Sequence, residues 1–543
     1  MTTPNIEIAG FGATAHTVRF WAALVRGYHA LARREMLACG FILILTLGLR
    51  AALLPWLAVP QPVIHDEFSY LLAADTYAHG RLANPPHPLW QHFESFQILQ
   101  QPTYSSKYQP LQGLVLAFGQ KFFGLPWIGV YLSMGLLCAA LCWMLQGWIA
   151  PEWALLGALL CVLRVGVLSY WMNSYLGGAV AGTGGALALG AIVRVWRRKQ
   201  FGHAITWALG LAILVLSRPY DAAVVGAASA AMLFWFLRKY DTPWKTIARR
   251  VAVPALLVLL LCMAGVGYND YRVTGHAVTL PYQVHNSQYE MSSMFTMMPL
   301  GAEPLYRHAV LRKFYADWQV SQWAFSRQSP IENMLLKLYT FGDFFFAFWF
   351  LSIPLLLWPY TLVTAEERAT VFLGSVFVLM ITLLIATQPH YGAAFAGVFY
   401  LRFLQGLQRL WSWRPAGRLA AAVLMVLMVG DGLGLSWSRD LISRGFTLRE
   451  SEAGFPRHAV QQSLEGMPGS QLVMVRYGAE HDPQIEWVYN RANINASKVV
   501  WAREMGPLQD RDLLAYFQDR RVWLLEADQS PPRLSPYPRV GRP

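Results

Sequence analysis

The sequence predicts an all-α protein that crosses a membrane many times and carries a small α/β domain after its last span. Of its 543 residues, 55% are hydrophobic and only 14% are charged, a composition too apolar for a water-soluble chain of this size. Apolar runs of about 20 residues recur between residues 36 and 437, and each is long enough to cross a bilayer as a helix. After residue 437 the pattern changes to short strands and one amphipathic helix.

Basic residues set the orientation of the spans. Several arginines precede the first apolar run, which predicts a cytoplasmic N-terminal segment over residues 1–35. The net charge of +13 comes largely from short loops between spans, so it indicates topology and contact with membrane lipids instead of binding to nucleic acid. About eleven crossings are expected, near 36–60, 126–148, 152–172, 174–194, 203–217, 221–237, 250–268, 339–360, 369–388, 391–409 and 418–437.

One apolar stretch, residues 108–124, is ambiguous. If it crossed the membrane, the basic clusters at 194–199 and 238–250 would fall outside. If it lies in the interface as an amphipathic helix, all of them fall inside, which is the arrangement we predict. The polar and aromatic loops then collect on the outer side, including a first outer loop at 61–125 and a long outer loop at 269–337.

The chain after the last span has its own pattern. Residues 36–437 are predicted to form the membrane domain, and residues 438–543 a separate extracytoplasmic α/β domain. Strands are expected at 472–475, 499–501 and 522–525, with an amphipathic helix at 508–519. This segment contains no glycine-rich phosphate loop and no recognisable catalytic motif.

An acidic pair, Asp66 and Glu67, follows the first span directly. The loop around it is dense in His, Trp, Tyr and Pro, which predicts a folded cap over a cavity. A carboxylate held under such a cap can accept a proton from a hydroxyl group, so both acids are candidate catalytic residues. The alternative is that they are ordinary solvated loop acids.

Further candidates lie at the outer ends of the predicted spans. Arg218 precedes Pro219 at a helix tip and suits a phosphate group, although it could instead form a structural pair with Asp221. Arg50 lies within the first span, so it must face a partner or a wet cavity, or extend to the interface. The complete set of candidate substrate-binding residues is Arg50, His65, Lys107, Tyr108, Asn173, Tyr175, Arg218, Asp221, His390 and Tyr391.

A metal site is conceivable from His65, Asp66, His87 and His92, but their spacing is irregular. The sequence requires no cofactor, and it leaves open whether a divalent metal ion assists.

These features together resemble the GT-C superfamily of glycosyltransferases. The resemblance rests on the Asp66–Glu67 pair after the first span, Arg50 within that span, the segment Tyr108-Gln109-Pro110-Leu111, and the soluble C-terminal domain. The most similar groups are the protein O-mannosyltransferase, aminoarabinose transferase and Rgt-like enzymes. Many members carry an acid in the second outer loop, where this chain has Asn173.

The resemblance implies a function as well as a fold. It implies transfer of a sugar from a polyprenyl-phosphate donor to a lipid, glycan or protein acceptor, with Asp66 as base and inversion by direct displacement. It also implies a bacterial inner membrane protein whose active site faces the periplasm or exterior, and a role in the cell envelope. Two alternatives remain, a transporter or lipid flippase, and a non-catalytic assembly or sensor protein anchored by its spans.

Overall fold

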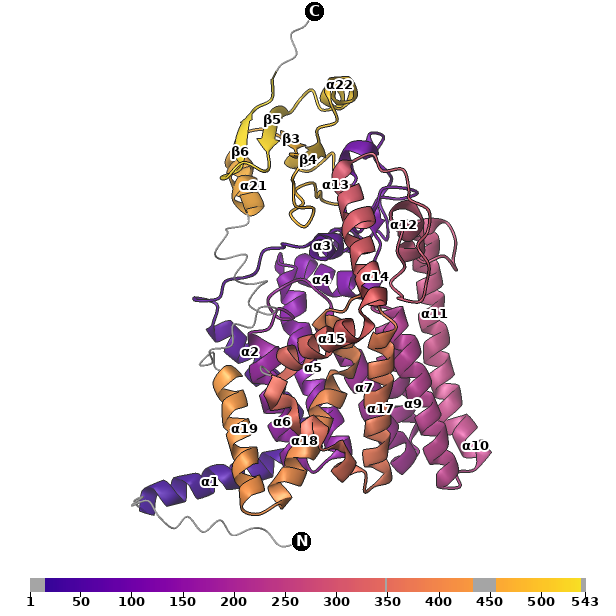
Figure 1. Cartoon of the computed structure of the whole chain (residues 1–543), viewed down its shortest axis with the longest axis vertical. Coiled ribbons are helices and arrows are strands. Elements are labelled where there is room, and N and C mark those ends of the chain that lie inside the picture. The colour runs from indigo at the N-terminus through magenta and orange to yellow at the C-terminus, as the bar shows by residue number, and fades with distance from the viewer. Residues whose placement is uncertain (1–14, 347–348, 433–455, 539–543) are drawn as a thin grey trace, which may run out of the picture.

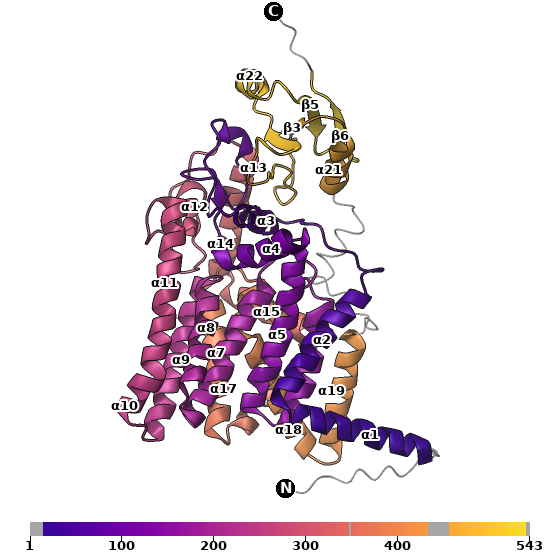
Figure 2. The ribbon, with the colours of Figure 1, turned by 180° about the vertical axis from the view of Figure 1, so that it is seen from behind.

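A computed structural model describes residues 15–346, 349–432 and 456–538. Within these ranges the protein is mostly helical, and a small domain with a four-stranded sheet follows the last helix of the bundle. Figures 1 and 2 show the helices packed side by side and the sheet domain beyond one end of the bundle. The predicted boundary at residues 437 and 438 lies outside the described residues, and so do residues 1–14 of the predicted segment 1–35.

Five stretches of the described chain are helical, long and apolar enough to cross a membrane. They are α2 (Glu35–Ala52), α5 (Trp127–Trp148), α7 (Gly178–Arg198), α9 (Pro219–Lys239) and the continuous stretch Trp244–Thr274, which contains α10 (Trp244–Ile247), the π-helical turn η3 (Ala248–Ala252) and α11 (Val253–Thr274). The apolar helix α8 (Phe201–Val215) is shorter. The count of about eleven crossings therefore stays a prediction.

The remaining predicted crossings coincide with helices that, over their described residues, do not meet both the length and the apolar character of these five. These are α6 (Pro151–Cys161) with the π-helical turn η2 (Val162–Val167), α15 (Pro330–Phe346), η5 (Trp349–Ser352), α16 (Ile353–Leu356), η6 (Trp358–Thr361), α17 (Ala365–Thr382), η7 (Pro389–Phe395), α18 (Ala396–Ser412) and α19 (Ala416–Gly432). The first predicted span, 36–60, was too long, because α2 ends at Ala52 and gives way to turns around Pro55. A proline disfavours helical geometry in the residue before it and has no N–H to continue the helix.

The ambiguous segment forms α4 (Pro110–Phe123), which packs against α5 and against α3 (His65–Ala78). Figure 2 shows α3 and α4 lying across one end of the bundle, between the long helices and the sheet domain. Pro110 starts α4 at a position where no N–H is needed, and Gly124 ends it with a φ of 70°. The interfacial arrangement expected from the basic loops stays a prediction. At the opposite end of the bundle lies α1 (Ala15–Ala32).

The predicted outer loops are folded into short elements. The first contains η1 (Trp90–Phe93) and a small ribbon of β1 (Ile98–Leu99) and β2 (Ser105–Ser106), besides α3 and α4. The second contains α12 (Pro281–Tyr289), α13 (Ala309–Arg312), the π-helical turn η4 (Lys313–Trp318) and α14 (Gln319–Gln328). In Figure 1 α3, α12 and α13 lie at the end of the bundle nearest the sheet domain.

The C-terminal domain contains α21 (Pro456–Gly466), β3 (Gln471–Arg476), β4 (Val499–Arg503), α22 (Pro507–Tyr516), β5 (Arg521–Glu526) and β6 (Arg533–Pro536). The strand order is β4-β3-β5-β6, with β3 parallel to β4 and β5, and with β6 antiparallel to β5. The predicted strands and helix of this domain match β3, β4, β5 and α22, whereas α21 and β6 were not predicted.

One face of this sheet joins the domain to the first outer loop. Leu472 and Met474 of β3 share a hydrophobic cluster with Phe68 of α3 and with Phe93. The ring of Phe68 stacks on Tyr489 of the C-terminal domain, with 4.0 Å between centroids and 5° between planes. Residues of opposite halves of the chain therefore form one buried core directly beside the acidic pair.

Candidate functional site

A cavity of about 1220 Å³ lies between the bundle and the C-terminal domain. Segments far apart in sequence line it, from α3, α4, the start of α9, the second outer loop, η7 and the C-terminal domain. Most of the predicted site residues lie in its wall, namely His65, Asp66, Lys107, Tyr108, Arg218, Asp221, His390 and Tyr391. Glu67, Arg50, Asn173 and Tyr175 do not.

Asp66 lies in the first turn of α3, where the helix dipole favours a negative charge. The Tyr108 hydroxyl donates a hydrogen bond of 2.5 Å to its Oδ1, and within the described chain this is the one hydrogen bond to the carboxylate. Burial raises the pKa of Asp66, while the Tyr108 hydrogen bond and the positive charges of Lys107 and Arg218 oppose that rise. Oδ2 is thus available to a hydroxyl group in the cavity.

Arg218 and Asp221 form the structural pair that the sequence left open. Arg218 Nε donates to Asp221 Oδ2 at 2.8 Å, and the guanidinium carbon lies 4.5 Å from the centre of the Tyr391 ring. That hydrogen bond uses only Nε, and the Arg218 side chain remains 21% exposed in the cavity wall. A structural pair and a phosphate contact through the Nη groups are therefore compatible.

Lys107 is paired with Glu290, a residue that sequence reasoning missed. Lys107 Nζ lies 2.9 Å from Glu290 Oε1 and 4.6 Å from the centre of the Tyr282 ring. Burial would raise the pKa of Glu290, but Lys107 and His285 lower it to about 2. Burial and the nearby Lys107 lower the pKa of His285 to about 4, so His285 is neutral at neutral pH.

Two histidines of the wall are held by tyrosine hydroxyl groups. His65 Nδ1 lies 2.7 Å from the Tyr489 hydroxyl, and its ring stacks on Phe96 at 4.1 Å. Burial lowers the pKa of His65 to about 4. His390 Nδ1 lies 2.9 Å from the Tyr170 hydroxyl. Both histidines are buried, so these contacts hold neighbouring elements together at the cavity wall.

Glu67 is directed away from the cavity. Its Oε2 accepts hydrogen bonds from the backbone N–H groups of Val63 and Ile64, and its Oε1 accepts one from Tyr175 at 2.8 Å. Burial raises the pKa of Glu67 to about 7, although these N–H groups lower it. The acidic pair is thus divided, because Asp66 faces the cavity while Glu67 fastens the start of α3 to the loop before α7.

Arg50 and Asn173 also bind protein groups. Arg50 is fully buried and donates to Asn173 Oδ1 at 3.0 Å and to the carbonyl oxygens of Leu57 and Ala58. The Tyr175 hydroxyl donates to the carbonyl oxygen of Pro60. Three explanations were offered for Arg50, namely a partner, a wet cavity and extension to the interface, and the structure shows the first. These contacts hold the chain that leads from α2 to α3.

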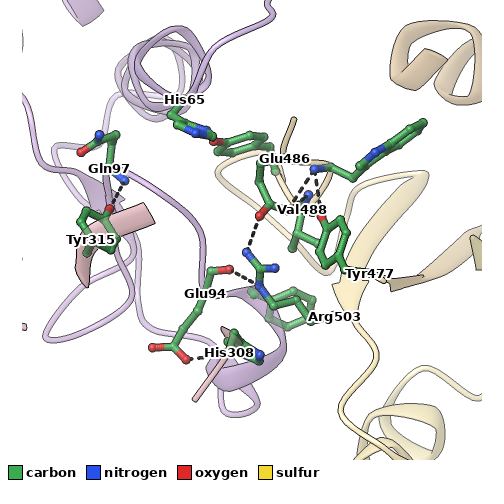
Figure 3. A network of polar contacts seen from close by, with 12 residues as sticks. His65, Glu94, Gln97, His308, Tyr315, Tyr477, Glu486, Val488 and Arg503 are labelled. Carbon is green, nitrogen blue, oxygen red and sulfur yellow. Dashed lines mark hydrogen bonds and ion pairs between the residues drawn. The ribbon is translucent and has the colours of Figure 1, made fainter. Parts of the chain in front are cut away.

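A buried ionic network docks the C-terminal domain on the first outer loop, as Figure 3 shows. Arg503 Nη2 lies 2.6 Å from Glu486 Oε2, and Arg503 Nε donates to the Glu94 carbonyl oxygen at 2.8 Å. Glu486 also accepts hydrogen bonds from the backbone N–H groups of Trp487 and Val488. The hydrogen bond from Arg503 to Glu94 therefore holds the C-terminal domain, which forms one wall of the cavity, against the first outer loop.

The four residues considered for a metal site have separate partners. His87 Nε2 lies 3.1 Å from Asn495 Oδ1, and His92 Nδ1 lies 3.1 Å from the Arg503 carbonyl oxygen. Within the described ranges, no group of three or more His, Cys, Asp or Glu side chains is placed to hold a metal ion. The structure therefore does not assemble the metal site considered from the sequence.

Comparison with known proteins places the fold. No family model matches the sequence, and no curated protein matches it. Among solved structures, ArnT from Cupriavidus metallidurans bound to undecaprenyl phosphate is similar, with a TM-score of 0.51 and 13% identity over 93% of each chain. The apo Archaeoglobus fulgidus oligosaccharyltransferase gives a TM-score of 0.47 and 12% identity over 82% of this chain, which spans 62% of that protein. The likeness to ArnT shows that the two chains share a fold.

Proposed function

We propose that the protein is a membrane glycosyltransferase that moves a sugar from a polyprenyl-phosphate donor to an acceptor hydroxyl on the outer side of the membrane. The observation that carries this proposal is one cavity in which the Asp66 carboxylate, with one oxygen available, lies in the same wall as two cationic side chains, Lys107 and Arg218. The fold supports it, and the similar ArnT structure contains undecaprenyl phosphate.

The reaction needs one base. Asp66 Oδ2 accepts the proton of the acceptor hydroxyl as its oxygen forms a bond to the anomeric carbon of the donor sugar. The bond between that carbon and the phosphate oxygen breaks on the opposite face, and the polyprenyl phosphate leaves with the electron pair. The product therefore has the inverted anomeric configuration. The phosphate is already a good leaving group, so no general acid is required.

The cations stabilise the departing phosphate. Arg218 presents its Nη groups to the cavity while Asp221 holds its Nε, which fixes the guanidinium plane for contact with phosphate oxygens. Lys107 adds a second positive charge next to Asp66, and Glu290 holds it in place. Glu67, Arg50 and Asn173 act as positioning residues, because each binds the backbone that carries the wall.

The test is transfer activity of purified Asp66→Asn protein in proteoliposomes, with labelled polyprenyl-phosphate sugars as donors and envelope lipid, glycan or protein fractions as acceptors. Loss of a general base lowers kcat by about 100-fold to 10,000-fold. Asp317→Asn is the matched control, because Asp317 is a 52% exposed acid of the outer side that does not line the cavity. Full transfer by Asp66→Asn, or a product with retained configuration, would contradict the mechanism.

A further inference from the structure

The cavity has two walls of different chemistry. Every acidic or basic side chain that lines it comes from residues 63–391. The lining residues from the C-terminal domain carry no charge, and they include Gln484, Gln529 and Ser530. The charged wall contains the groups assigned above to the donor phosphate and to the proton transfer, whereas the uncharged wall has no role in those steps.

An exposed aromatic ring stands at the junction of the two walls. Trp318, at the end of η4, lines the cavity and is 43% exposed. Its indole stacks on Phe314 with 5.0 Å between centroids and 25° between planes, and Phe314 in turn packs edge-on against His65 at 5.1 Å. The indole is therefore supported on one face and remains open to the cavity, where it can cover an apolar surface of a ligand.

Gln319, the next residue, has an unused hydrogen-bonding group. Its Oε1 is buried in the cavity wall and accepts no hydrogen bond from any described residue. A buried amide oxygen without a partner costs free energy, so it indicates a donor that arrives with a ligand or with water. Gln484 and Gln529 add two further planar amides, each with both donor and acceptor atoms.

The segments that carry these side chains are tied together. Asp528 accepts hydrogen bonds from His481 Nδ1 at 2.5 Å and from the Gly478 N–H at 2.7 Å, which joins the loop before Gln484 to the loop before Gln529. Lys313 Nζ at the start of η4 donates to the Ala479 carbonyl oxygen at 3.0 Å. The indole and the three amides thus belong to one preorganised surface.

We propose that Trp318, Gln319, Gln484 and Gln529 form the acceptor subsite and that the acceptor is an uncharged saccharide. The flat indole suits the apolar C–H face of a sugar ring, and planar amides suit pairs of neighbouring hydroxyl groups. A wall without cationic groups gives no attraction to phosphorylated or uronic acid sugars. The word acceptor rests on the proposed function, but saccharide binding does not.

The test measures binding by the full-length protein in nanodiscs to an array that carries uncharged hexose and N-acetylhexosamine oligosaccharides beside uronic acid and phosphorylated ones. Wild-type protein is expected to bind uncharged glycans preferentially, and Trp318→Ala and Gln319→Ala are each expected to weaken binding by about tenfold or more. Trp56→Ala is the matched control, because Trp56 is 82% exposed and does not line the cavity.

The outcomes separate this subsite from the transfer reaction. Asp66→Asn should bind the same glycans as the wild type, so loss of transfer with retained binding supports both proposals. Retained binding with full transfer by Asp66→Asn would remove the catalytic assignment and leave the subsite intact. Binding that is unchanged in both Trp318→Ala and Gln319→Ala, preference for anionic glycans, or no binding of uncharged glycans at millimolar concentration would overturn the subsite.

Discussion

The Tyr108 hydroxyl controls the protonation of Asp66, and its removal gives the most specific test of the site. In Tyr108→Phe, the 2.5 Å hydrogen bond to Asp66 Oδ1 is lost while the ring remains. That hydrogen bond lowers the pKa of Asp66, because it stabilises the carboxylate against the effect of burial. The variant therefore has a higher Asp66 pKa than the wild type.

The magnitude follows from the energy of a hydrogen bond to a charged group. Such a bond contributes about 1.5–3 kcal/mol, and 1.36 kcal/mol corresponds to one pKa unit, so the pKa rises by about 1–2 units. Asp66 faces a cavity into which water can enter, which reduces the effect, and we expect the lower end of this range. Asp66 acts in its ionised form, so kcat/KM falls as pH decreases through its pKa, and in the variant this fall begins about 1 pH unit higher.

The assay is the pH dependence of kcat/KM for transfer in proteoliposomes, from about pH 5 to about pH 9. Tyr70→Phe is the control, because Tyr70 also lines the cavity and stacks on Tyr108 at 4.6 Å, yet no described hydrogen bond joins it to Asp66. The reasoning is refuted if the acid limb of Tyr108→Phe coincides with that of the wild type, moves to lower pH, or moves no further than that of Tyr70→Phe.

Two further predictions concern residues that position the site. Glu67→Ala leaves three backbone N–H groups without their acceptor, each at a cost of about 1–3 kcal/mol. The melting temperature of this variant in detergent should therefore fall clearly, while that of Asp66→Asn stays near the wild type. Equal melting temperatures for both variants would contradict this role of Glu67. Arg503→Met removes the hydrogen bond to the Glu94 carbonyl oxygen and also leaves Glu486 buried without its cation, at a cost of about 3–5 kcal/mol. Limited proteolysis should therefore release the C-terminal domain faster than in the exposed-site control Arg511→Met, and equal rates would argue against this docking role.

The local sequence pattern predicted those elements of the C-terminal domain that have a clear pattern of their own. The strands β3, β4 and β5 are short, rich in β-branched or aromatic residues and bounded by turns, so they were recognised without knowledge of their neighbours. The helix α21 was missed because it is short and mostly polar, and the strand β6, with the sequence Arg-Leu-Ser-Pro, carries too few apolar residues to show alternation. Pairing with β5 determines β6, and pairing is not visible in the local sequence.

The candidate site was predictable where a residue's position along a span determines its side of the membrane. Asp66, Lys107 and Arg218 all follow from that argument, and the structure places them around one cavity. The protein partners of these side chains could not be predicted from their positions along the spans. Glu290 lies 183 residues from Lys107, and Asn173 lies 123 residues from Arg50, so an ion pair or buried hydrogen bond could not be distinguished from a ligand contact.

The uncharged wall was missed for a related reason. Gln484 and Gln529 lie in loops without hydrophobic periodicity, and no motif identifies them. The domain that carries them is placed by the hydrogen bond from Arg503 to the Glu94 carbonyl oxygen, by the contact of Lys313 with Ala479, and by the sheet face that covers Phe68. The sequence predicted the C-terminal domain as a separate unit but gave no signal that it helps to enclose the cavity.

The contact of His65 and Phe68 with Tyr489 has a consequence for how the protein matures in the cell. Residues near position 530 line the cavity, so the cavity cannot be complete before the ribosome has translated them. Asp66 is translated long before these residues, so its side of the cavity stays unshielded until the C-terminal domain has folded onto α3. The cavity with both of its walls is therefore complete only after residues near position 530 have been translated and have packed beside α3.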